Sequence, residues 1–183
     1  MFWAGECQLN SHIIGIISAV WTTISDAGVE EEEATTSQLD SHANMIVVGS
    51  QATILGDSGQ SADVKPFSKD CSKLESVPIV DAALAYDCPF SGKTFILTVR
   101  NALHVKSMHH NLIPPFILRE AGLKVNDIPR IHTDADELNN ETHCIVSEGK
   151  GTNAELKIPL RLDGVFSYFE TRQLTAEEVA SCE

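Results

Sequence analysis

The residues best placed to do chemistry are Asp40 and the residues that follow it, Ser41, His42 and Ala43. The aspartate ends a short apolar approach, and a second apolar, β-branched run follows at residues 45–48. A carboxyl group in a tight turn between two strands is a candidate acid or base, because its apolar surroundings control its protonation. The same Asp-Ser pair is also typical of an ordinary turn, in which the side chains bond the local backbone.

A second Asp-Ser pair lies at Asp57 and Ser58 and is followed by Gly59. No apolar strand leaves it, since residues 60–63 are Gln, Ser, Ala and Asp. We therefore predict a surface turn at this point. Asp40 and Asp57 cannot form a catalytic pair within one chain, because the 17 residues between them cannot build two equivalent lobes.

The other chemistry-bearing residues form no recognisable site. The histidine spacings fit no ordinary zinc site, and neighbours on a strand point apart, so we predict no metal. The residues considered for zinc are His104, His109, His110, His132, His143 and Cys144. The chain has no Gly-rich phosphate loop and no Gly-x-Ser-x-Gly motif. Its five cysteines are an odd number without paired spacing, which argues against a disulfide scaffold.

The composition bounds the class of protein. The chain has 183 residues, of which 43% are apolar, enough for one folded domain with extensions. Its 13 basic and 26 acidic residues give a formal charge of −13, so we predict no direct binding to nucleic acid, which needs a clustered basic surface. The longest apolar stretch, residues 13–21, is about half the length that spans a bilayer. We expect a soluble, intracellular protein without a membrane segment.

Short apolar runs at residues 45–48, 52–55, 77–80 and 94–99 are bounded by Gly, Pro and Asp. Runs of this length and spacing indicate an all-β sandwich or barrel. A short helix is predicted over residues 115–121, because it has Pro at its start and Gly just past its end.

The segments before and after this β-rich region, residues 1–37 and 128–183, have a different composition. Residues 1–37 contain four consecutive glutamates, which repel one another and indicate a solvated acidic linker; the alternative is a contact with a basic partner. Residues 128–183 form a C-terminal extension with a polar loop at 134–141 and strands at 144–146 and 156–162. A short terminal helix is predicted from the capping-box spacing of Thr175 and Glu178.

Residues 38–127 resemble the protease region of copia-type retrotransposon polyproteins, a retropepsin-like aspartic protease. The loop of that family reads Asp-Ser-Gly-Ala between a hydrophobic pair and an apolar strand, and Asp40, Ser41 and Ala43 match it. Further on, the family has a strand, a Leu-x-Val segment, and an Asn-Leu-Leu run that leads into a short helix ending in Gly. Here these pieces are residues 94–99, 103–105, 111–113 and 116–122, in the same order.

The resemblance implies a mainly β fold, a retropepsin-like closed acid-protease barrel with one short helix. It implies peptide hydrolysis by a water molecule held between two aspartates, without a cofactor. The chain has one complete motif, so Asp40 would meet its equivalent in a homodimer, and a polyprotein or peptide would be the substrate. Ser41 would brace the paired loops, Ala43 would allow close packing, Asn44 would hold substrate backbone, and residues 78–93 would cover the substrate. The implied location is the cytoplasm or a virus-like particle.

His42 departs from the family, which usually has Gly at this position. A Gly there leaves room for the backbone amide to point at the carboxylate. Two readings stay open: an active aspartic endopeptidase, or a catalytically inactive relic that keeps the fold and dimerises or binds peptides. A third is a small β-domain protein unrelated to proteases.

Overall fold

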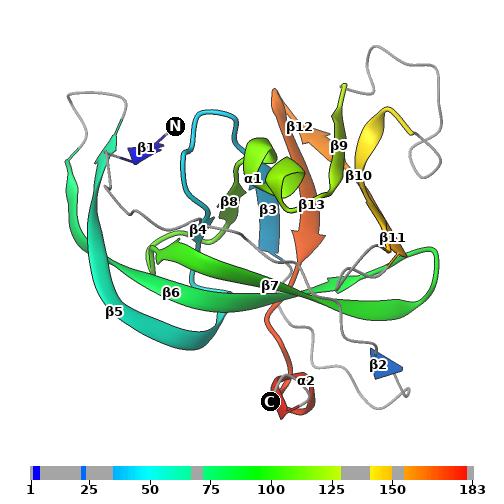
Figure 1. The fold of residues 1–183 in the computed structure, drawn as a ribbon, viewed down its shortest axis with the longest axis horizontal. Helices are drawn as coiled ribbons and strands as arrows, with labels where there is room; N and C mark the ends of the chain where they lie inside the picture. Colours follow the sequence, from blue (N-terminus) through cyan, green and yellow to red (C-terminus); the bar gives the residue numbers. More distant parts are fainter. Residues whose placement is uncertain are drawn as a thin grey trace.

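The structure is a computed structural model, which describes residues 2–4, 22–23, 35–66, 72–128, 141–149 and 155–180. Strands dominate these residues, so the protein is mainly β, as the short β-branched runs predict. Long curved strands form the lower part of the molecule, and shorter strands lie above them (Figure 1).

The strands form two sheets. The larger sheet has the order β1 (Phe2–Ala4), β5 (Thr53–Pro66), β6 (Leu74–Asp87), β7 (Lys93–His104), β4 (Val47–Val48), β8 (Asn111–Ile113), β3 (Thr35–Leu39), β13 (Phe166–Thr171) and β12 (Arg161–Asp163), with β2 (Thr22–Thr23) paired to β7. The smaller sheet has the order β11 (Glu155–Pro159), β10 (His143–Glu148) and β9 (Lys124–Asp127). The helices are α1 (Pro115–Glu120) and α2 (Ala176–Ala180).

Strand β6 forms the centre of the long antiparallel hairpins, between β5 and β7. Its residues 82–86 are all buried, and successive side chains point to opposite faces. Leu84 and Tyr86 belong to the main core, whereas Ala83 and Ala85 contact Leu174 beside α2. The small alanine side chains let other layers lie close to the strand, so this part of the sheet is covered on both faces.

Three short strands, β4, β8 and β3, lie side by side in the middle of the larger sheet. Strand β3 pairs parallel to β8, and β4 pairs antiparallel to β8 and parallel to β7. The main-chain N–H of Leu103 donates to the Ile46 carbonyl (2.9 Å), and that of Val105 donates to the Val48 carbonyl (3.0 Å). The Leu-x-Val and Asn-Leu-Ile segments therefore both lie next to the strand that follows Asp40.

The C-terminal part of the chain joins the same sheet. Strand β13 pairs antiparallel with β3, where Tyr168 lies opposite Gln38. Buried residues of the smaller sheet, such as Ile145 and Ile158, pack with Ile117 and Phe169 in the main core. A cavity of about 20 Å³ remains inside this core, and its lining is apolar and includes Ile46, Leu97 and Phe169.

The closed barrel is not found among the described residues. Their strand order is an open path that ends at β1 and β12, and these two strands are not paired with each other. Closure requires the end strands to be neighbours, but β1 pairs with the distal half of β5, whereas β12 follows β13 at the opposite end of the path.

The local predictions mostly agree with the structure. Within residues 38–127 helix α1 is present, with Pro115 at its start, and the terminal helix α2 is also present. The predicted capping box forms: the main-chain N–H of Glu178 donates to Thr175 Oγ1 (3.2 Å), and that of Thr175 donates to Glu178 Oε2 (2.9 Å). Most of the predicted linker 1–37 and of the loop 134–141 lies outside the described residues. The division at residues 38, 127 and 128 stays a prediction.

Candidate functional site

The candidate site is the loop that begins where β3 ends. The main-chain N–H of Asp40 donates to the carbonyl of Ile113 (3.2 Å), which extends the parallel pairing of β3 with β8 by one residue. The N–H of Ala43 lies 3.4 Å from the Asp40 carbonyl and closes a turn, and Ala43 is buried. The aspartate is thus held at the junction of the two parallel strands.

The side chain of Asp40 is only 8% exposed. Its Oδ1 atom accepts a hydrogen bond from the main-chain N–H of His42 (2.9 Å), which orients the carboxyl group inside the turn. Ser41 is exposed, with its Oγ 3.4 Å from His42 Nδ1, and Asn44 is also exposed. The loop therefore combines a buried carboxylate with a polar outer surface.

His42 fits this loop in the single chain. Its Nδ1 atom lies 3.7 Å from Asp40 Oδ1, and its side chain is 58% exposed. It is not among the described non-glycine residues with positive φ, so the backbone at this point does not require glycine. The bond to the carboxylate uses the main-chain N–H, which histidine supplies as well as glycine does. His42 could therefore obstruct the loop only where it meets the loop of a second chain.

A buried polar network joins the strands that flank the loop. Asn111 Oδ1 accepts from the main-chain N–H of Gly49 (2.9 Å), and its Nδ2 donates to Ser37 Oγ (3.1 Å). Ser37 Oγ also lies 2.9 Å from Thr171 Oγ1. The network ties β3, β8, β13 and the end of β4 together. In a buried setting each of these hydrogen bonds is costly to lose.

Position 49 has no room for a side chain larger than that of glycine. A Cβ atom there would lie 2.5 Å from the Met108 carbonyl oxygen and 2.8 Å from that of His110. Sequence reasoning gave no structural role to Gly49, Ser37 or Thr171. For Gly49 the only local indication was its place in the Gly-Ser pair that ends the apolar run 45–48. The residues next to Ser37 and Thr171 in the sequence gave no indication of their role.

Asp57 lies in a different setting. It belongs to an irregular stretch of β5, where the register with β6 shifts between Asp57 and Gln60. Gly59, with φ of +71°, donates its N–H to Asp57 Oδ1 (2.8 Å), and Ser58 Oγ donates to the Ile79 carbonyl (2.6 Å). These residues are exposed. This segment is thus a bulge inside strand β5. Several strands of the larger sheet separate it from β3, which leads into the Asp40 loop.

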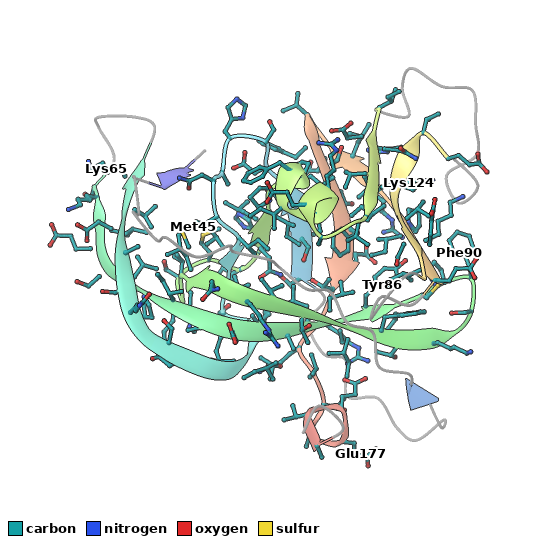
Figure 2. All side chains as sticks on the ribbon, in the orientation of Figure 1. Met45, Lys65, Tyr86, Phe90, Lys124 and Glu177 are labelled. Carbon is teal, nitrogen blue, oxygen red and sulfur yellow. The ribbon has the colours of Figure 1, made fainter. Side chains whose placement is uncertain are left out.

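An apolar cluster continues from the Asp40 loop toward the β5–β6 hairpin. Met45 and Val47 pack there with Met108, and the distal hairpin contributes Val64 and Val77. Figure 2 shows Met45 on the side of the loop that faces β5. In contrast, the residues predicted to cover a substrate, 78–93, mostly build the buried middle of the sheet. The distal part of β5 and β6 is the hairpin that lies over the cluster.

Of the residues considered for zinc, His132 lies outside the described residues. Among the residues that the structure describes, no group of three or more His, Cys, Asp or Glu could hold an ion. His143 is buried with Nε2 2.9 Å from Ser167 Oγ, so it links β10 to β13. Burial lowers the pKa of His104 and of His110. Burial also raises the pKa of the Cys144 thiol, although a contact with Asn126 opposes this.

The fold and the site define a mainly β protein with a buried aspartate at the junction of two parallel strands. Comparison of the chain with protein-family models, curated proteins and solved structures finds no match. Neither helix of the described residues is long and apolar enough to cross a membrane.

Proposed function

We propose that this protein is an aspartic endopeptidase of a retrotransposon polyprotein, acting on a polyprotein or peptide through Asp40. The observation that carries the proposal is the loop of Asp40. Its carboxyl group is buried, its main chain is bonded to Ile113, and its Oδ1 accepts from the N–H of His42. An oriented carboxylate of this kind can act as a general base toward a water molecule.

The arrangement of the other matching pieces supports the proposal. The Leu-x-Val segment and the Asn-Leu-Ile run are distant from Asp40 in the sequence, yet each pairs with a strand that flanks the loop. Helix α1 follows directly.

The proposed chemistry needs a second aspartate. Two carboxyl groups about 3 Å apart cannot both ionise easily, so one acts as a base toward water while the other keeps its proton and polarises the scissile carbonyl. The sequence has one complete loop motif, so in this proposal the partner of Asp40 is the same residue of a second copy. In this homodimer Ser41 would brace the paired loops by hydrogen bonding, the buried Ala43 would allow close packing behind them, and Asn44 would bind substrate backbone.

The test replaces one aspartate at a time. Asp40→Asn keeps the size of the side chain but removes the ionisable group, so acid-optimal cleavage of a peptide library should fall below detection. Asp57→Asn is the matched control and should leave the rate nearly unchanged, because Asp57 lies in an exposed bulge. Loss of activity in Asp57→Asn with retention in Asp40→Asn would show that the site is elsewhere.

The alternative is a catalytically inactive relic that dimerises or binds peptides. The exposed imidazole of His42 favours it, because two copies would both have to accommodate this ring at the axis. Absence of cleavage in the parent and in His42→Gly, with a dimer still present in solution, would support this alternative.

A further inference from the structure

The C-terminal segment that ends in α2 covers the face of β6 and β7 that is turned away from the main core. Leu174 packs there with Ala83, Ala85 and Ile96, and Val179 of α2 lies against the same cluster. Figure 1 shows α2 below the long strands, with β3 and β8 above them. The segment is thus an outer layer of the molecule. We call its residues, 172–180, the C-terminal clasp.

The clasp is joined to the strands by main-chain bonds at its beginning. Arg172 and Ala85 exchange both of their main-chain hydrogen bonds (3.0 Å each), and the N–H of Leu174 donates to Thr53 Oγ1 (3.1 Å). Helix α2 itself has five residues, and a helix of this length is not stable without tertiary contacts. The position of α2 therefore depends on the side chains that hold it.

An ionic cluster holds α2 in place. The guanidinium of Arg172 donates to both carboxylate oxygens of Glu178 (2.8 and 2.9 Å) and to both of Asp87 (2.8 and 3.1 Å). The side chains of Arg172 and Glu178 are only 18% and 8% exposed. In a pair as buried as this one, loss of one charge leaves the other uncompensated, so the contact is sensitive to protonation.

The groups around Arg172 come from each element that packs against the clasp. Strand β6 contributes Asp87, and α2 contributes Glu178. Strand β7 contributes the uncharged Thr94, which donates to Asp87 (2.6 Å) and follows Lys93 in the strand. The titratable groups bonded to the guanidinium are therefore the two carboxylates.

Acid removes both of these negative charges. Burial acts to raise the pKa of Glu178 and of Asp87, but the bonds from Arg172, with those from the Thr175 main chain and from Thr94, outweigh it and lower both pKa values. The two carboxylates therefore stabilise the clasp fully above their ordinary pKa values of 4.5 and 3.8, and this stabilisation is lost as the pH falls below them. A peripheral segment with few contacts opens locally at a lower free energy than the whole fold.

We propose that the C-terminal clasp is an acid-released cover, which detaches from β6 and β7 as one unit when Asp87 and Glu178 are protonated, while the strands stay folded. Its release uncovers the apolar strip of Ala83, Ala85 and Ile96 on the outer face of the larger sheet. The clasp does not involve the Asp40 loop, so the inference is independent of the proposed function.

Amide hydrogen exchange of the full chain, followed by NMR and corrected for the intrinsic rate at each pH, measures this opening. The hydrogen-bonded amides of Leu174 and Val179 report on the clasp, and those of Leu103 and Val105 report on the strands. All four should be protected at about pH 7. At about pH 2.5 the clasp amides should exchange within about tenfold of their intrinsic rates, whereas the strand amides should stay protected by at least about a thousandfold.

Two variants test the ionic cluster. Arg172→Met leaves the buried Glu178 without its partner, so protection of the clasp should be low at neutral pH and should rise as the carboxyl group is protonated, opposite to the parent. Glu178→Gln should lower the protection at about pH 7 by at least about tenfold and weaken its dependence on pH. Glu177→Gln is the matched control, because Glu177 is exposed on the same helix (Figure 2), and it should follow the parent.

Each outcome decides the proposal. Loss of protection by the clasp and the strands together would show global acid unfolding and would overturn it. Clasp amides that stay protected at about pH 2.5, or a Glu178→Gln variant with the pH profile of the parent, would also overturn it. If Arg172→Met does not fold, Glu178→Gln with its control decides the same question. No peptidase assay enters these outcomes, so failure of the proposed function would leave the inference intact.

Discussion

The imidazole of His42 lies beside the Asp40 carboxylate but extends into solvent. In the proposed dimer two such rings must fit between the two loops, whereas glycine would place no side chain there. We expect His42→Gly to raise peptide cleavage by about tenfold, equivalent to about 1.4 kcal/mol of transition-state stabilisation. The measurement is kcat/KM at acid pH, with His42→Ala as an intermediate. A slower glycine variant would show that the imidazole assists the reaction.

The hydroxyl of Tyr86 is buried without a hydrogen-bond partner among the described residues. Its ring packs edge-on against Phe169, with centroids 6.1 Å apart, and burial raises the pKa of the phenol. Tyr86→Phe keeps the ring contact and removes the unsatisfied oxygen, so it should increase the free energy of unfolding by about 1 kcal/mol. Urea denaturation measures this, with the half-buried Tyr168→Phe as control. Destabilisation by Tyr86→Phe would reveal a partner for the hydroxyl.

At the scale of elements, Arg172 anchors helix α2 to the β6–β7 hairpin. Its guanidinium donates to both carboxylate oxygens of Asp87 (2.8 and 3.1 Å) and of Glu178 (2.8 and 2.9 Å). Thr94 also donates to Asp87 (2.6 Å). Burial is the largest influence and would by itself raise the pKa of Glu178 and of Asp87. The hydrogen bonds and charge of Arg172, together with a hydrogen bond from the Thr175 main chain to Glu178 and from Thr94 to Asp87, outweigh it, so both pKa values are lowered from their ordinary values.

A carboxyl group whose pKa is lowered by folding stabilises the fold fully above its unfolded pKa. That stabilisation is lost as the pH falls below the ordinary value, 4.5 for Glu178, and through the lower folded value. Glu178→Gln should therefore cost about 2 kcal/mol of unfolding free energy at pH 7. The difference from the parent should shrink as the pH falls below about 4.5. Denaturation at several pH values measures this, and the exposed Glu177→Gln is the control. A difference independent of pH would contradict the ionic role.

At the scale of the whole molecule, the proposed site exists only in a dimer. Specific activity should therefore fall on dilution, with the rate rising as the square of protein concentration well below the dissociation constant. Because each chain carries a charge of −13, adding salt from about 20 to about 200 mM should tighten the dimer by screening the repulsion. Sedimentation and initial rates check both. A rate strictly linear in concentration, from a monomeric protein, would contradict the proposed dimeric site.

The sequence by itself determined the local structure of this protein. Short β-branched runs predicted strands, Pro115 predicted the start of α1, and Thr175 with Glu178 predicted the capping box of α2. It also predicted that Asp40 lies in a turn between two strands. These features depend on neighbours a few residues apart, so the physics that decides them is contained in a short window of sequence.

Only the tertiary structure decided which segments meet. Asn111 bonds Ser37 across 74 residues, and Arg172 bonds Asp87 across 85 residues. The place of β13 beside β3 and the open order of the larger sheet have the same origin. Several strand partners satisfy the same apolar pattern, and packing of the whole core selects among them. For this reason the sequence predicted the turn that carries Asp40, whereas the network that supports it was visible only in the folded chain.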